Sequence, residues 1–217
     1  MKKLSLSVML AILAAVLFTG VSAANCCKDK KEMSSKSDML KMDMRMLWED
    51  HINYTHMYIV AAVAGSDDAG KLAERLLKNQ QDIGDAIKPY YGDEAGNKLT
   101  ALLKDHILIA AELVGAAKAG DSAKAAEAEK KWYANADDIA AFLSGANKNW
   151  TKESLVEMMK THLSLTKTIA VARLNKDVDA EIKAADSNHE HILMMADALS
   201  SGIVKQFPKK FEGKSCS

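Results

Sequence analysis

The sequence predicts an all-α protein, and three observations lead to this prediction. Its 217 residues include only 2 prolines and 11 glycines, so few positions interrupt a helix. Charged residues make up 27% of the chain and hydrophobic residues 48%, a balance typical of helices around a core. Apolar side chains recur at steps of three and four residues, as they do along one face of a helix. We therefore expect six antiparallel helices, paired as three related αα-hairpins, in one helical bundle.

Breaker residues set the expected bounds of these helices. Gly65 and Gly120 are expected to end the first and third helices, and Pro89 to end the second, since proline cannot donate the backbone hydrogen bond that continues a helix. We expect the bundle to cover residues 41–211, after a flexible tether at 25–40 and before a tail at 212–217. The helices are predicted at about residues 39–64, 69–87, 94–119, 122–143, 151–175 and 178–206.

The first 24 residues resemble a secretory signal. Lys2 and Lys3 precede an apolar stretch at 4–21, and small residues follow at 22–24, as at a cleavage site. The prediction is therefore a protein outside the cytoplasm: secreted, periplasmic or on the cell surface. Two alternatives place it at a membrane, namely an uncleaved anchor and lipidation of Cys26.

Charge and cysteine content exclude several classes of protein. The chain has 29 basic and 29 acidic side chains, which argues against a generally basic nucleic-acid-binding protein. Its 3 cysteines are too few for a small scaffold held by disulfides. In an oxidising compartment, Cys26, Cys27 and Cys216 could join the two ends of the chain or link two chains, and the sequence leaves both open. The oligomeric state is not readable from the sequence.

Two markers recur in phase along the predicted hairpins, with a period near 55 residues. The first, third and fifth helices carry His51, His106 and His162 on their apolar stripes. The second, fourth and sixth carry the pattern Asn-x-x-(Asp/His)-Ile, beginning at Asn79, Asn135 and Asn188. Because each hairpin turns back on itself, we expect each histidine to lie level with the marker of its partner helix. The sequence therefore predicts a buried polar layer made by three related hairpins.

This layer has two interpretations. Imidazole and carboxylate groups are common ligands of zinc, iron, copper and nickel, so the layer is a candidate site for a transition-metal ion. Alternatively, each histidine hydrogen-bonds the Asn or Asp of its own hairpin and only satisfies the core. The Glu-x-x-His motif of di-iron bundles is not present. The candidate ligands are His51, His106, His162, His191, Asp82 and Asp138.

Several segments resemble a bacterial all-helical family of unassigned activity. They include Asn79–Gly92, Glu94–Thr100, Asn135–Ala140, His191–Leu193 and Gln206–Phe211, and the resemblance covers about residues 45–211. Some members of that family are named acetylglutamate kinase or glycosyltransferase, but this chain has no phosphate-binding glycine loop between a strand and a helix. The resemblance implies the helical fold and no mechanism. We expect an exported binding or scaffold protein that holds a metal ion or small ligand; the alternative is an extracytoplasmic metal-dependent enzyme that uses the same layer.

Overall fold

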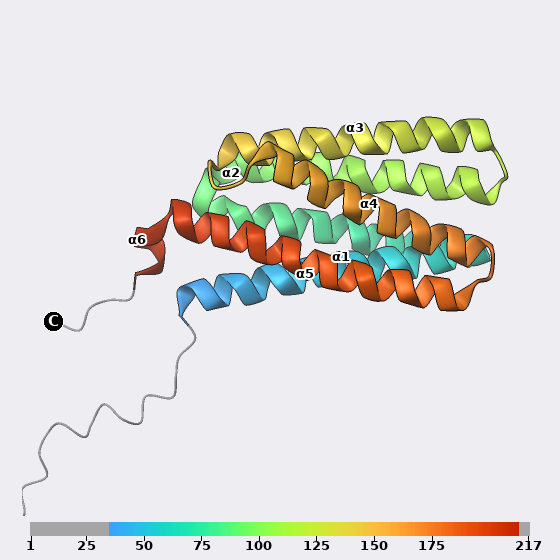
Figure 1. The fold of residues 1–217 in the computed structure, drawn as a ribbon, viewed down its shortest axis with the longest axis horizontal. Helices are drawn as coiled ribbons and strands as arrows, with labels where there is room; N and C mark the ends of the chain where they lie inside the picture. Colours follow the sequence, from blue (N-terminus) through green and yellow to red (C-terminus); the bar gives the residue numbers. More distant parts are fainter. Residues whose placement is uncertain (1–34, 213–217) are drawn as a thin grey trace, which may run out of the picture. The chain divides into compact units, whose positions relative to one another are not determined.

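Five long helices and one short helix make up residues 35–212, the part of the chain that this computed structural model describes (Figure 1). The predicted signal, residues 25–34 of the predicted tether, and all three cysteines lie outside the described residues. The helices are α1 (Lys36–Ala64), α2 (Ala69–Lys118), α3 (Ser122–Ala146), α4 (Lys152–Leu174), α5 (Val178–Gln206) and α6 (Pro208–Phe211).

Helix α1 begins slightly earlier than the sequence predicted. Ser35 caps it, because its side chain accepts a hydrogen bond from the Asp38 backbone amide while the Asp38 carboxylate accepts one from the Ser35 amide. Leu40, in the predicted tether, is buried in the core. Residues 36–40 therefore belong to the bundle. The other end of α1 is as predicted, with Gly65 in the left-handed region at φ 74°.

Helix α2 corrects the predicted effect of Pro89. The helix continues through this residue and bends at Gly92, which has φ 84° and ψ 168°, a conformation that favours glycine. Aromatic packing holds the last turn before the bend, since Tyr90 stacks on Phe211 with ring centroids 5.6 Å apart. The bend lies five residues beyond the predicted helix end at 87. It divides α2 into a first half, residues 69–91, and a second half, residues 93–118.

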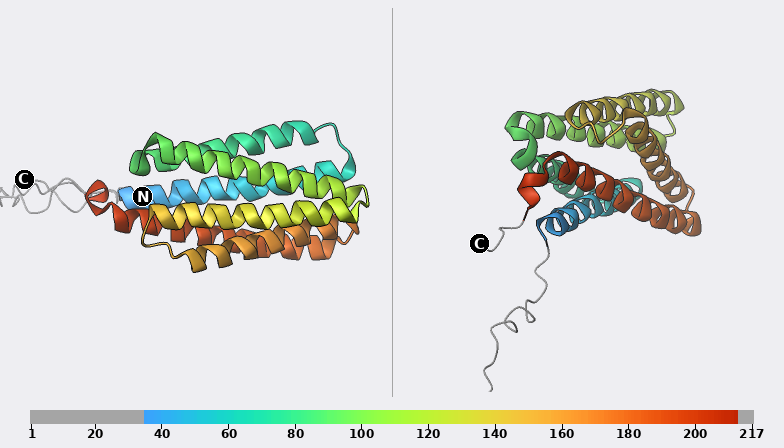
Figure 2. Two further views of the ribbon diagram at one scale, coloured as in Figure 1. Left: turned by 90° about the horizontal axis from the view of Figure 1, so that it is seen from above. Right: turned by 60° about the vertical axis from the view of Figure 1, so that its left-hand side comes forward.

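The three predicted hairpins are present in the bundle. Helix α1 packs against the first half of α2, the second half of α2 packs against α3, and α4 packs against α5 (Figures 1 and 2). Contacts of α1 with α5 and of α3 with α4 join the hairpins to one another. The two halves of α2 approach closely at Gly84, which has no side chain. A Cβ atom at this position would lie only 1.9 Å from Thr100 Oγ1 in the other half. The all-α fold and its bundle arrangement are confirmed.

Most of the hydrophobic core lies toward the end of the bundle that carries α6. One large cluster there includes Trp48, Leu103, Ile139 and Trp150, and a small second cluster forms around Ile59 and Val114. No helix within residues 35–212 is long and apolar enough to span a membrane.

Candidate functional site

Three histidines meet in the centre of the bundle, one from each hairpin. His51 comes from α1, His106 from the second half of α2 and His162 from α4, and each is 2% exposed. The ring centroids of His51 and His162 are 5.4 Å apart, and those of His106 and His162 are 6.3 Å apart. The repeat therefore places all three histidines in the core, as the sequence predicted.

Carboxamide side chains fix two of these rings. Asn135 Nδ2 donates to the Leu102 carbonyl, so its Oδ1 faces His106 and accepts from Nδ1–H at 2.7 Å. Asn188 Nδ2 donates to Thr166 Oγ1, so Asn188 Oδ1 accepts from His162 Nδ1–H at 3.1 Å. Both imidazoles therefore carry their proton on Nδ1 and leave Nε2 without one.

The third ring has the opposite tautomer. Gln80 Nε2, which also donates to the Leu76 carbonyl at 2.9 Å and to Asn79 Oδ1 at 3.0 Å, lies 3.2 Å from His51 Nδ1. An amide nitrogen only donates, so this ring nitrogen carries no proton. His51 Nε2–H then donates to His162 Nε2 at 3.4 Å. His106 Nε2 is buried and has no hydrogen-bond partner among the described residues. We call these three histidines with Gln80, Asn135 and Asn188 the histidine layer.

A second set of hydrogen bonds shows the repeat at atomic detail. In each hairpin the backbone carbonyl four residues before the histidine accepts a side-chain donor from the partner helix. Asn79 donates to the Leu47 carbonyl at 2.9 Å, and Asn135 does so to Leu102 at 3.1 Å. In the third hairpin His191 Nε2 is the donor, to the Met158 carbonyl at 2.9 Å. The Asn pattern indicated Asn79 as the partner of His51. Because Asn79 donates to the Leu47 carbonyl instead, the residue beside the His51 ring is Gln80.

The histidine layer is uncharged near neutral pH. Burial lowers the pKa of His106 to about 3, with a further lowering by the neighbouring His162 that the Asn135 hydrogen bond opposes. Burial also lowers the pKa of His162 to about 4, and the hydrogen bond that His162 donates to Asn188 opposes this lowering. The pKa of His51 is held well below its usual value by burial and then by the other two imidazoles. A neutral layer fits inside an apolar core.

The structure does not bring the other three candidate ligands to the layer. Asp82 pairs with Lys78 in the same helix, and Asp138 is exposed to solvent. His191 is half-buried and directed at the Met158 carbonyl. Three residues advance a helix by about 300°, so each carboxylate is offset by about 60° from its core-facing Asn and lies toward the side of the helix. Within residues 35–212, no group of three or more His, Cys, Asp and Glu side chains is arranged to hold a metal ion.

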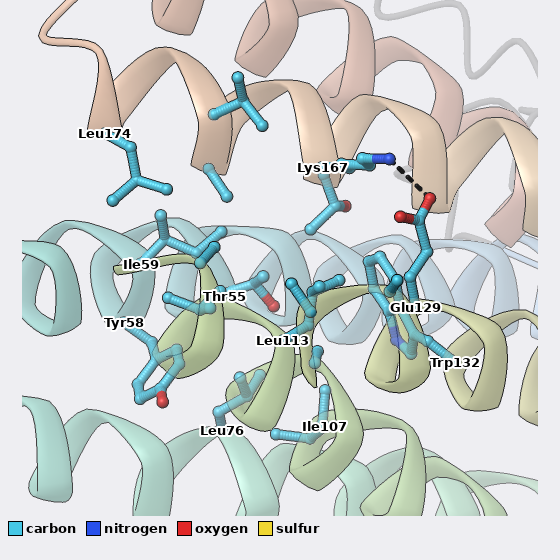
Figure 3. A pocket seen from close by; sticks show the side chains of 18 of the residues that line it. Thr55, Tyr58, Ile59, Leu76, Ile107, Leu113, Glu129, Trp132, Lys167 and Leu174 are labelled. Carbon is cyan, nitrogen blue, oxygen red and sulfur yellow. Dashed lines mark hydrogen bonds and ion pairs between the residues drawn. The ribbon is translucent and has the colours of Figure 1, made fainter. Parts of the chain in front are cut away.

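An apolar cavity of about 260 Å³ lies next to the histidine layer, and Figure 3 shows the side chains that line it. Its walls come from α1, α2, α3 and α4. Thr55, Ala110 and Thr166, each four residues after a histidine of the layer, line the end nearest to it. The remaining lining residues are Tyr58, Ile59, Leu76, Ile107, Leu113, Val114, Ala117, Ser122, Ala125, Ala126, Glu129, Trp132, Lys167, Ala170, Val171 and Leu174.

The cavity is elongated along the bundle axis. Its lining residues span positions 107–117 of α2 and 122–132 of α3, and ten residues of α-helix rise about 15 Å. An engineered cavity of about 150 Å³ with apolar walls is enough to bind benzene. This cavity, at about 260 Å³, has room for a longer apolar molecule.

Among the described residues that line the cavity, Glu129 and Lys167 are the only ones with charged side chains. Lys167 Nζ of α4 lies 2.6 Å from Glu129 Oε1 of α3, and Figure 3 shows this pair beside Trp132. The Lys167 side chain is 43% exposed and that of Glu129 31%, so the pair lies where the cavity wall reaches solvent.

The cavity was not predicted from the sequence, because no motif marks it. The signal was the small size of the residues that follow each histidine and of the alanines on α3, such as Ala125 and Ala126. Small residues on a core-facing stripe reduce the volume that fills the core, but alanine is also common in helices for its propensity alone.

Comparisons of the chain with protein-family models, with curated proteins and with solved structures find no match. The resemblance to a bacterial helical family therefore stays a prediction.

Proposed function

We propose that this protein is an exported helical binding protein that holds a small apolar molecule in the cavity beside the histidine layer. The observation that carries the proposal is the cavity itself, about 260 Å³ with walls made almost wholly of apolar side chains. Binding sites for small molecules are typically concave and apolar, with a few polar groups at defined places. The secretion signal expected at residues 1–24 supports the export part of the proposal.

An apolar ligand in this cavity would cover apolar wall that otherwise faces water. The cavity is partly open to solvent, since the half-exposed Glu129–Lys167 pair lies in its wall. Covering apolar surface is favourable, and a ligand that binds the folded state raises the free energy of unfolding by mass action.

The histidine layer has a structural role in this proposal. Its hydrogen bonds join α1 to α2, α2 to α3 and α4 to α5, so they fix the register of each hairpin. The layer also separates the apolar cavity from the tightly packed core on its other side. The histidines do not line the cavity themselves, because Thr55, Ala110 and Thr166 form the cavity end nearest to them.

Displacement of a fluorescent apolar dye tests the proposal. The purified protein is expected to bind the dye, and straight-chain compounds of increasing length should displace it up to a limit set by the cavity. The substitution Ala110→Leu places three extra carbons in the cavity and should abolish binding. The matched control is Ala101→Leu, on the exposed face of the same half of α2 and outside the cavity. Equal dye binding by both variants would show that the cavity is not the site.

A second candidate function, a metal-dependent enzyme outside the cytoplasm, has one observation in its favour. The Nε2 atoms of His51 and His162 are 3.4 Å apart, and His106 Nε2 is buried without a partner among the described residues. Zinc with three histidine ligands is a common catalytic arrangement. In this candidate, His51 would have to release the proton that it now places between the two rings, and no carboxylate would balance the charge of the metal. Apolar binding is therefore the function we propose first.

A further inference from the structure

The chemical class of the ligand follows from the charges on the cavity wall, and this inference rests on the proposed function. We infer that the cavity takes an uncharged chain-like molecule, such as a long-chain alcohol, ester or hydrocarbon. The Glu129–Lys167 ion pair, on this inference, discriminates against fatty acids and alkylamines of the same length.

The first argument is the position of the ion pair. Glu129 lies one turn before Trp132 on α3, and Lys167 follows Thr166 on α4; all four residues line the cavity (Figure 3). The two charged groups are in direct contact, with Lys167 Nζ 2.6 Å from Glu129 Oε1. A polar head group that entered with an apolar chain would meet both charges at once.

The second argument is the balance of those charges. A carboxylate that approaches Lys167 also approaches the Glu129 carboxylate, so attraction and repulsion largely cancel. An ammonium group meets the same situation with the signs reversed. An ion also loses hydration when it leaves water, and an apolar wall does not replace that hydration. The pair therefore gives an ionised ligand no compensation for its desolvation.

The third argument is that the polar groups nearest to the histidine layer are already engaged. Thr55 Oγ1 donates to the His51 carbonyl at 2.6 Å. Thr166 Oγ1 accepts from Asn188 Nδ2 at 3.4 Å. The end of the cavity nearest to the layer thus offers no free charge to a buried head group, and together with the paired Glu129 and Lys167 it favours an uncharged ligand.

Three ligands of equal chain length test this inference on the full protein at pH 7: decan-1-ol, decanoate and decylammonium. Their affinities are measured by displacement of the apolar dye and by calorimetry. We expect decan-1-ol to bind at least about tenfold more tightly than either ion, which is a difference of one decade in Kd. Decanoate or decylammonium binding as tightly as decan-1-ol would overturn the inference.

Variants of the pair should change this preference in opposite directions. Lys167→Gln leaves Glu129 unpaired and should strengthen decylammonium binding by about tenfold, while Glu129→Gln leaves Lys167 unpaired and should strengthen decanoate binding by a similar factor. Decan-1-ol binding should change little in both. The matched control is Lys131→Gln, because Lys131 pairs with Glu127 at 2.9 Å on α3 and neither residue lines the cavity.

The exchanged pair Glu129→Lys with Lys167→Glu adds a check that keeps the wall neutral. It should return the preference of the protein to decan-1-ol, and thermal unfolding of each variant verifies that it is folded. Single variants whose preference among the three ligands stays that of the wild type would contradict the role of the pair. If the dye and all three ligands fail to bind to the wild type, the proposed function itself is wrong, which is a different outcome from a wrong charge preference.

Discussion

The two sides of the histidine layer differ sharply in packing, although the same three hairpins build both. Three residues before the histidines stand Trp48, Leu103 and Met159, all buried in the large core cluster. Four residues after the histidines stand the smaller Thr55, Ala110 and Thr166, which line the cavity. We call the first side the filled half and the second the open half.

The free volume of the two halves shows the consequence. The void inside the core of the filled half, lined by residues such as Ile83, Trp150 and Ile203, is only about 20 Å³, whereas the cavity of the open half is about 260 Å³. Two features leave the open half less filled. Figure 1 shows α4 starting beside α3 and running away from it toward α5, and the side chains that follow the histidines are small.

The largest effect is expected from charging the layer that separates the halves. The pKa values of folded His106 and His162 are about 3 and about 4, below the usual value of 6.5, so the unfolded chain binds more protons between these values. The free energy of unfolding should therefore be highest above about pH 6.5 and fall as the pH drops toward 4. Each of the two histidines should contribute a loss of about 1.4 kcal/mol for each pH unit below 6.5. Urea unfolding from pH 7 to pH 4 measures this loss.

A control for this pH dependence is the double variant His106→Leu with Asn135→Leu, which removes one histidine and its only carboxamide partner together. Its free energy of unfolding should depend less steeply on pH than that of the wild type. Identical slopes for the two proteins would contradict the prediction that His106 is neutral when folded and protonated when unfolded.

Truncation of one leucine in each half sharpens the comparison. Leu103 and Leu113 lie on the second half of α2, on opposite sides of the layer. Leu103→Ala should destabilise by about 2–5 kcal/mol, since it creates a cavity in a packed core. Leu113→Ala should cost less, about 1 kcal/mol, because Leu113 is half-buried and already faces free space. Equal losses in urea unfolding would mean that the open half is packed as tightly as the filled half.

The opposite change, from alanine to leucine, should separate the halves by a smaller amount. Ala140 is fully buried in the filled half, so Ala140→Leu should destabilise by about 1–3 kcal/mol through overpacking. Ala110→Leu extends into the cavity and should change the free energy of unfolding by less than about 1 kcal/mol. Thermal unfolding of both ligand-free variants gives the comparison, and a larger loss for Ala110→Leu would be inconsistent with an open half.

Metal ions are expected to have no effect on the Tm of the protein. If His51, His106 and His162 are structural, the Tm of the protein should not move with chelator or with added zinc, copper, nickel or iron. A bound ion at a hundredfold excess over its Kd would add about 2.7 kcal/mol to the free energy of unfolding. A rise in Tm with one metal that disappears in His106→Gln would favour the metal-dependent alternative.

Much of the fold was predictable because helical periodicity and breakers act locally. The structure has the last long helix at 178–206, as predicted, and the three histidines are buried where the apolar stripes place them. Pro89 was misleading because its effect depends on neighbours: Tyr90 and Tyr91 pack against residues more than a hundred positions away, and this packing holds the turn around it. The contact between Gln80 and His51 could not be predicted either. Asn79 and Gln80 are adjacent on the helix, and a small rotation of the helix decides which of them faces the His51 ring.

The all-α class, the three hairpins and the burial of one histidine from each could be predicted from the amino-acid pattern, because these depend on which residues share a helix face. Three features depend on how the helices pack: Asp82 and Asp138 stay outside the histidine layer, His51 and His162 are hydrogen-bonded in a neutral layer, and an apolar cavity lies beside that layer. A cavity is the space that several helices together fail to fill. No single helix face encodes it, and only the packed arrangement of four helices shows that the alanines and threonines after the histidines leave room for a ligand.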